Sequence, residues 1–371
     1  MRPRLVPFLA CPTTRSPLEL VAFETTSDEG GEDVLEGVLV GGGGHVYPIV
    51  RGMPRLVEGS LRLHTEFRRR HAARLAERGL TGDVALAPPS SEFERLVLPT
   101  MRRFEVEWGR HDLAGLTWGL DPATRVERLL EYVALPRDAL AGKVLLDAGA
   151  GTGQAACAYS RLSCEVVAVD LSPALERGRL ARRELAGGGH TRVHFVQGDL
   201  MRPPLRDGAF DVIHSSGVLH HTPDTRRAFD SVARLVAKGG VFGVWLYLPT
   251  PDWALPLLPF VGPPALSVGV QRLRRVTPRM NPRLLWAALW TYSAAFHVAY
   301  KANELVRRRP HRQTIRERTT SLFDTLAPPF VWRHTPDEVF AWFRELGFDE
   351  IADTSDAGNT AGFNVRGRRA R

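Results

Sequence analysis

The stretch "KVLLDAGAGTGQ" (143–154) joins an apolar run to an acidic residue and then to three glycines at alternate positions. The apolar run predicts a buried strand. The glycines predict a tight turn that opens a helix, because glycine tolerates sharp backbone turns and the close approach of a ligand. A dinucleotide-binding fingerprint would carry glycine or alanine where Gln154 stands, which disfavours NAD. The stretch therefore predicts the first strand–turn–helix unit of a ligand-binding α/β sheet.

The next two predicted strands also end in carboxylates. The strand in "CEVVAVDLSP" (164–173) ends in Asp170, 21 residues beyond Gly149, where an acid can accept both hydroxyls of a ribose. The strand in "RVHFVQGDL" (192–200) ends in Asp199, and a carboxylate there can accept a hydrogen bond from the exocyclic amine of adenine. These positions predict a nucleoside-binding edge of the sheet.

Two more strands follow, in "AFDVIHSSGVLHHTPD" (209–224) and "GGVFGVWLYLP" (239–249). Apolar runs that alternate with helical stretches are typical of βαβ units and a parallel sheet. Acidic or glycine residues thus recur at four successive strand ends. Ligands of open α/β sheets bind along that edge, so the ordered set is more specific than a single glycine loop.

The series "LLDAGAGTG", "VVAVDLSP", "VQGDL" and "FDVIHSSGVLHHTPD" resembles the class I S-adenosylmethionine (SAM)-dependent methyltransferases of the small-molecule type. The resemblance covers about residues 141–248, and residues 336–371 fit the final helix and strand pair of that family. It implies an α/β fold with a Rossmann-like, doubly wound, seven-stranded sheet whose last strand is antiparallel. It also implies SAM as the cofactor and a small-molecule acceptor.

The same resemblance assigns roles to residues at the strand ends. The first acid and its glycines would hold the methionine part of SAM, the second acid the ribose and the third the adenine. The segment after the fourth strand would line the methyl-transfer site. The residues expected to contact SAM are Asp147, Gly149, Gly151, Gly153, Asp170, Leu171, Gly198, Asp199, Leu200, Ser215, Ser216 and Gly217.

His220 and His221 follow the fourth strand, near where the methyl group would leave. A neutral imidazole near pH 7 suits the removal of a proton from a hydroxyl, a phenol or an acidic carbon. Either histidine is therefore a candidate catalytic base. The alternative is that both side chains only shape the loop, and the sequence leaves the two interpretations open.

Five segments are expected along the chain. The central one is the SAM-binding core, and a helical lid insertion would follow its fifth strand and cover an apolar or aromatic acceptor. The segments are a β-rich module (1–58), a helical arm (59–140), the core (141–248), the lid insertion (249–335) and the final helix and strand pair (336–371). Within the arm, Trp108 and Arg110 resemble an aromatic segment that folds over SAM in a subset of the family.

The first module resembles a zinc-ribbon-like domain that has lost its ligands. Only Cys11 remains of four cysteines, and Val40 and Gly43 stand where two others would be, just ahead of "YPI" (47–49). Structural zinc needs four Cys or His ligands, so we expect no bound metal. We also expect the module to lie far from the SAM residues.

The segment 284–300, "LLWAALWTYSAAFHVAY", is apolar but shorter than the roughly 20 residues of a membrane span. It suits a lid helix that packs on the acceptor pocket. Because arginines flank it on both sides, it also suits a helix that rests on a membrane or lipid surface.

The whole chain has 371 residues, a formal charge of +8 and only three cysteines. The short apolar start and the few cysteines predict a cytoplasmic protein without a disulfide framework. The arginine content leaves an RNA or other nucleic-acid methyltransferase as an alternative, but no Asn/Asp-Pro-Pro-Tyr/Phe loop follows the fourth strand. A non-catalytic SAM-fold binding protein is the other alternative. The sequence favours secondary metabolism and leaves the oligomeric state and the methylated atom open.

Overall fold

The computed structural model describes residues 1–371 except 112, 114–119, 250–253, 257–266, 308–313 and 357–360. Its main sheet is formed by β1 (Glu19–Asp28), β2 (Gly31–Gly41), β3 (His45–Val50), β4 (Met53–Leu56), β5 (Val144–Ala148), β6 (Glu165–Asp170), β7 (Val193–Gly198), β8 (Phe210–Ser216), β9 (Val236–Tyr247), β12 (Phe348–Asp353) and β13 (Gly362–Arg369). A small two-stranded sheet pairs β10 (Ala254–Pro256) with β11 (Ser267–Gly269).

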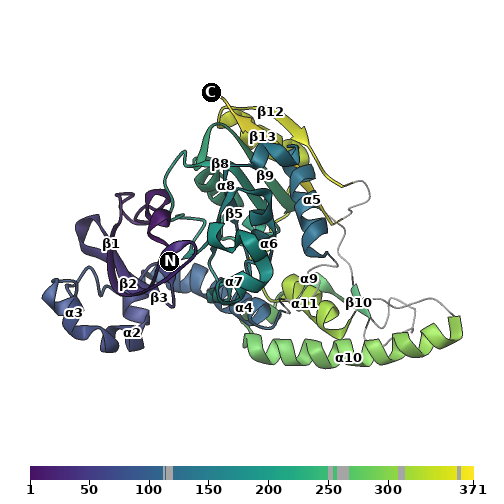
Figure 1. Ribbon diagram of the computed structural model, residues 1–371. Helices are drawn as coiled ribbons and strands as arrows, with labels where there is room; N and C mark the ends of the chain where they lie inside the picture. The colour runs from purple at the N-terminus through teal and green to yellow at the C-terminus, as the bar shows by residue number, and fades with distance from the viewer. Residues whose placement is uncertain (112, 114–119, 250–253, 257–266, 308–313, 357–360) are drawn as a thin grey trace.

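The helices pack on both faces and along one end of this sheet (Figure 1). They are α1 (Ser60–Leu63), α2 (Thr65–Arg70), α3 (Ala72–Glu77), α4 (Leu98–Gly109), α5 (Pro122–Val133), α6 (Gln154–Tyr159), α7 (Glu176–Ala186), α8 (Thr225–Ala233), α9 (Val270–Leu273), α10 (Pro282–Arg307), α11 (Ile315–Leu326) and α12 (Pro336–Glu345). None of the helices in the described residues combines the length and the hydropathy that a bilayer crossing requires.

The strand order explains why the acidic strand ends meet. The order is β1-β2-β3-β4-β7-β6-β5-β8-β9-β13-β12, and β5 pairs in parallel with both β6 and β8. The strand β13 is antiparallel to its neighbours β9 and β12. The predicted α/β class with a Rossmann-like sheet is confirmed, and the antiparallel strand lies between β9 and β12.

The core has the predicted seven strands, in the order β7-β6-β5-β8-β9-β13-β12, and the whole sheet has eleven because the β-rich module joins it. The β-rich module adds its four strands at the β7 edge, where Leu56 of β4 pairs in parallel with Gly198 of β7. An open edge leaves backbone N–H and C=O groups unpaired, and β4 satisfies those of β7. The expectation that the module lies far from the SAM residues is therefore wrong, because Gly198 precedes Asp199.

Alternate residues of the central strands enter two hydrophobic layers. Leu145 of β5 packs with α5, α6 and α7, whereas Leu146 packs with α8 and α12 on the other face. Successive side chains of a strand point to opposite faces, so a strand buried on both sides must be apolar throughout. This is why the first strand of the core reads as a continuous run of apolar residues.

In the module, the glycine run packs against the loop that carries the remaining cysteine. A Cβ at Gly41 would lie 2.9 Å from the Cys11 sulfur, and that sulfur lies 3.5 Å from the Tyr47 hydroxyl. Among the described residues, no group of three or more His, Cys, Asp or Glu side chains is placed to hold a metal ion. The descent of the module from a zinc ribbon stays a prediction.

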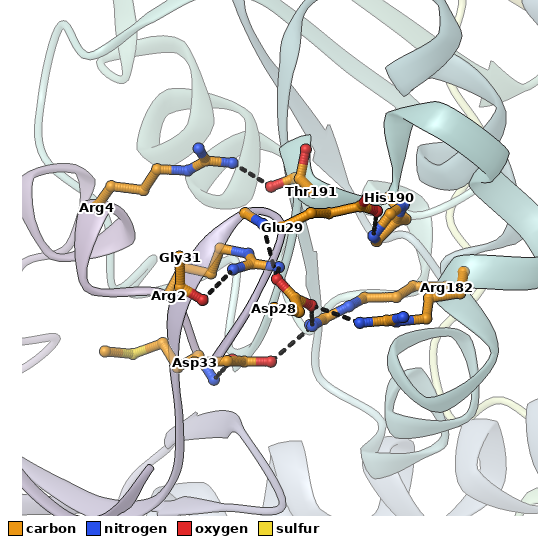
Figure 2. A network of polar contacts seen from close by, with 12 residues as sticks. Arg2, Arg4, Asp28, Glu29, Gly31, Asp33, Arg182, His190 and Thr191 are labelled. Atoms are coloured by element: carbon orange, nitrogen blue, oxygen red, sulfur yellow. Dashed lines mark hydrogen bonds and ion pairs between the residues drawn. The ribbon is translucent and has the colours of Figure 1, made fainter. Parts of the chain in front are cut away.

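Buried ion pairs clamp the module to the core helix α7 (Figure 2). Arg182 of α7 lies 2.6 Å from Asp33 and 3.7 Å from Asp28, and Arg2 lies 2.6 Å from Asp28. Burial alone would raise the pKa of Asp33, but the charges of the Met1 amino group and Arg182 outweigh burial and hold that pKa at about 2. The clamp therefore keeps its negative charges in the folded protein.

We expect Asp33→Asn to destabilise the protein by about 3–5 kcal/mol, because it leaves buried arginine charge without its partner. A depressed carboxylate pKa contributes stability above the unfolded-state pKa, and this stability is lost as the pH falls toward about 2. Urea unfolding across acidic pH measures both effects. The control is Asp207→Asn, whose carboxylate is 59% exposed and should contribute little. Equal stability of the two variants would contradict the clamp.

Candidate functional site

Asp170 at the end of β6 is fixed by the glycine turn that follows β5. Its two oxygens accept hydrogen bonds from the backbone N–H groups of Gly151 and Ser172, both at 2.7 Å. Burial nevertheless raises its pKa to about 6, because these two bonds offset only part of the desolvation. The predicted ribose acid and the predicted glycine loop therefore meet in space.

Asp147 at the end of β5 is buried beside Asp170. Burial raises its pKa to about 7, the nearby Asp170 charge adds to this rise, and Arg125 of α5 opposes it. Within the described residues, one oxygen of Asp147 is buried without a hydrogen-bond partner. A hydrogen-bond donor or a positive charge beside this buried oxygen would stabilise the ionised carboxylate.

Glu107 of α4 is a third acid at this edge, and the sequence analysis missed it. It is fully buried, and neither carboxylate oxygen has a hydrogen-bond partner among the described residues. Burial raises its pKa well above the ordinary value, and the charges of Asp324 and Asp170 raise it further. Three buried acids thus lie close together, and among the described residues both Glu107 oxygens and one Asp147 oxygen lack a hydrogen-bond partner. Such burial is costly, so the cluster Asp147–Asp170–Glu107 suits a cationic ligand.

The glycine turn lies against α4. Gly151 has a φ of +57°, and a Cβ there would lie 3.1 Å from the Trp108 indole. Gly149 has a φ of +92°, and a Cβ there would lie 2.2 Å from Val218. Both positions need glycine for the backbone and for the close contact. Gly153 follows with a φ of +77° and is the N-cap residue of α6.

The arm segment is held over the turn from both sides. Trp108 accepts a hydrogen bond from Arg177 of α7 through its carbonyl, and Gln154 donates to the Leu113 carbonyl at 2.6 Å. Arg110 stacks over Trp286 of α10, 5.6 Å from the ring centre. Of the two arm residues singled out from the sequence, Trp108 lies at the glycine turn, whereas Arg110 joins α4 to α10.

The predicted adenine end opens into a cavity of about 220 Å³. Asp199 lines it and accepts from the Met201 N–H at 2.9 Å, and burial raises the Asp199 pKa. The other walls come from the β-rich module and from the segment before α4, through Leu56, Val57, Phe93 and Val97. Leu171 packs on Val57, Phe93 and Val97, whereas Leu200 packs in the main hydrophobic core.

The residues predicted after the fourth strand take different positions. The Ser215 hydroxyl donates to the Ala148 carbonyl at 2.9 Å, so it ties β8 to β5. Ser216 is exposed, and Gly217 turns the chain with a φ of +74°. Ser215 therefore supports the site from inside the sheet and has its hydroxyl engaged there.

The two histidines differ in their polar surroundings. The His221 Nδ1 lies 3.0 Å from the Phe330 carbonyl, so this nitrogen carries the proton and Nε2 is free to accept one. Nε2 lies 3.6 Å from Asp324 of α11, and Asp324 accepts a hydrogen bond from Tyr247 at 2.7 Å. His220 stacks on Tyr247 at 4.0 Å, and both its ring nitrogens lack a hydrogen-bond partner in the described residues.

Burial lowers the pKa of both imidazoles, so both are neutral near pH 7. For His221, the Asp324 charge and the Phe330 carbonyl oppose this effect and would stabilise an added proton. Only His221 has a carboxylate beside the nitrogen that would receive a proton. The pair of His221 and Asp324 is therefore the better arrangement for a base.

The core is similar in sequence to known methyltransferases. Residues 146–244 match the family described as "Methyltransferase domain". The match covers 99 of the 371 residues and lies within the core predicted from the sequence. A curated relative, the demethylmenaquinone methyltransferase of Clavibacter sepedonicus, is 35% identical over 101 residues, which are 27% of this chain and 40% of the relative. The malonyl-[acyl-carrier protein] O-methyltransferase of Methylovorus sp. (strain MP688) is 31% identical over 144 residues, 38% of this chain and 47% of that protein.

The chain spans less than half the length of these two relatives. Among solved structures, the 1,6-didemethyltoxoflavin-N1-methyltransferase of Burkholderia thailandensis is similar with a TM-score of 0.40 and 16% identity, over 77% of this chain and 93% of that one. At this TM-score and identity the likeness carries no argument about function.

We expect SAM to bind more weakly as the pH falls through about 7, because the Asp147 carboxylate then becomes protonated and loses its attraction for a cation. Titration calorimetry at several pH values, in buffers of different ionisation enthalpy, should also detect proton release on binding. Asp147→Asn should weaken binding roughly tenfold to a hundredfold and flatten the pH dependence.

The matched control for this prediction is Asp138→Asn, an exposed acid ahead of β5. It should leave both the affinity and its pH dependence unchanged. An affinity of the unchanged protein for SAM that is constant across this pH range would contradict the role given to Asp147.

Proposed function

We propose that this protein transfers the methyl group of SAM to a small acceptor that is apolar or aromatic. The observation that carries the proposal is the buried acid cluster Asp147–Asp170–Glu107 beside the glycine turn, in which Glu107 and one oxygen of Asp147 lack a hydrogen-bond partner among the described residues. SAM carries a sulfonium and an ammonium group, and this pair of positive charges would neutralise such a cluster. The match of residues 146–244 to a methyltransferase domain supports the same ligand.

The described residues fit SAM along the whole edge. Asp147 and Glu107 would attract its positive charges, and Asp170 would accept from the ribose. Asp199, which lines the cavity, would accept from the adenine amine. When bound, SAM supplies an activated methyl group, so the protein's main task is to hold the acceptor in line and to exclude water. The arm with Trp108 covers the turn and suits that second task.

His221 would act as the base for an acceptor that arrives protonated. Its Nδ1–H is fixed by the Phe330 carbonyl, which leaves Nε2 as the proton acceptor. A proton on Nε2 would face the Asp324 carboxylate and would be stabilised there. Asp324 would act as a positioning residue in this scheme. His220, stacked on Tyr247, would hold the loop in place.

The acceptor class is supported by the relatives and by the residues near His221. The matched curated proteins are named for demethylmenaquinone, a malonyl-carrier protein and sterols. Here Phe104 packs edge-on against His221, 5.5 Å from ring to ring, and Tyr247 lies beside it. Aromatic neighbours of this kind favour an acceptor with an apolar body and one reactive atom.

Incubation of the protein with methyl-labelled SAM and a bacterial extract tests the acceptor class. We expect the label to enter an organic-soluble product that resists ribonuclease and protease, and mass spectrometry then identifies it. Asp147→Asn should lose the labelling and Asp138→Asn should retain it. Label in RNA would support the nucleic-acid alternative instead. SAM binding without any transfer would support a non-catalytic protein.

With that acceptor, His221→Ala should lower turnover by about 10²–10⁴-fold while SAM affinity is retained, because only proton removal is lost. The rate of the unchanged enzyme should fall at acidic pH, where His221 becomes protonated, and Asp324→Asn should shift this limb to lower pH. The control is His194→Ala, another buried histidine beside a carboxylate, Glu165. It should keep its turnover per folded molecule. Near-normal turnover in His221→Ala would rule out the base.

A further inference from the structure

The long helix α10 presents an exposed face that carries no charge. Figure 1 shows α10 along the lower edge of the molecule, on the side away from the β-rich module's outer strands. Its inner side packs on α11 and α4 through Leu285, Trp286 and Leu289. Its outer side exposes Leu284 by 68% and Val298 by 70%.

The residues between these two complete an apolar stripe. Positions three and four apart share one face of a helix. The exposed residues at this spacing are Leu284, Ala287, Ala288, Thr291, Ala295 and Val298. The outer face of a surface helix is ordinarily polar and charged, and this one has a single threonine hydroxyl, which bonds to the Ala287 carbonyl. The face is therefore built to meet an apolar partner.

Positive charge surrounds the stripe. From Trp253 to Asn303 the chain has six Lys and Arg residues and no Asp or Glu. Four of the arginines are exposed in the segment that leads into α10 and in its first turn: Arg272, Arg275, Arg279 and Arg283. Within the described part of the chain, none of these four forms an ion pair with a carboxylate. Their charge is thus available to an anionic partner.

We propose that the α10 surface, defined as Leu284–Val298 with Arg272, Arg275, Arg279 and Arg283, docks on an anionic lipid bilayer. Apolar side chains would enter the acyl boundary while the arginines contact lipid phosphates. A second copy of the chain would offer these arginines no carboxylate from the same surface, because residues 253–303 contain no Asp or Glu, whereas lipid phosphates supply the complementary charge. The helix would lie in the plane of the interface, consistent with its lack of a membrane-spanning segment among the described residues.

The test is sedimentation of the full-length protein with phosphatidylglycerol-rich vesicles and with phosphatidylcholine vesicles. We expect binding to the anionic vesicles, and release at high salt because salt screens the arginines. The variant Arg275→Gln/Arg279→Gln/Arg283→Gln should weaken partitioning by roughly two orders of magnitude. The variant Leu284→Gln/Val298→Gln should weaken it at least about tenfold.

Two controls match these changes. Arg69→Gln/Arg78→Gln/Arg95→Gln removes the same charge from exposed arginines elsewhere, and Leu180→Gln alters an exposed apolar residue of α7 that is 62% exposed. Both should bind vesicles normally, and SAM affinity should be retained in every variant as evidence of folding. This outcome is independent of methyl transfer.

Equal binding to neutral and anionic vesicles, or equal loss in the control variants, would overturn the proposal. So would a stable dimer in analytical ultracentrifugation that Leu284→Gln/Val298→Gln dissociates, because the face would then be covered by a second copy.

Discussion

The desolvation of carboxylates at one edge of the sheet is the constraint on which the site depends. Asp147 and Asp170 end adjacent parallel strands, and Glu107 approaches them from α4. Each acid is buried, and their mutual repulsion is strong in a medium of low dielectric constant. Two backbone N–H groups satisfy Asp170, but no described group satisfies Glu107 or the second oxygen of Asp147. A bound cation removes this penalty, which links the fold of the edge directly to the chemistry of SAM.

The β-rich module is part of this edge. Its last strand, β4, continues the sheet beyond β7, and its next residue, Val57, lines the cavity at Asp199. The ion pairs of Asp28 and Asp33 with Arg182 hold the module on α7, whose own N-terminal turn lies close to the glycine loop. The module, whatever its ancestry, thereby gives the cavity at Asp199 one of its walls.

Residues beyond the core domain supply the opposite side. Asp324 comes from α11, and Phe330 comes from the segment that follows it. Together they fix the tautomer of His221 and place a negative charge beside its free nitrogen. The helix α10 packs on α11 with its inner face and leaves its outer face apolar. The insertion of residues 249–335 thus contributes polar groups beside His221 on its inner side. On its outer side it contributes an apolar and basic surface.

The sequence by itself determined the strand–glycine–helix unit and the acids at Asp147, Asp170 and Asp199, because the signal for each lies within a few residues of its own strand end. Parallel strands then bring these ends to one edge. Glu107 and Asp324 could not be predicted because nothing local separates them from other helical acids. Asp324 reaches His221 across 102 intervening positions. The joining of the β-rich module to the core sheet could not be predicted from local sequence either. Alternation of apolar residues predicts a strand but does not say which edge it joins, and only the tertiary structure decided that β4 pairs with β7.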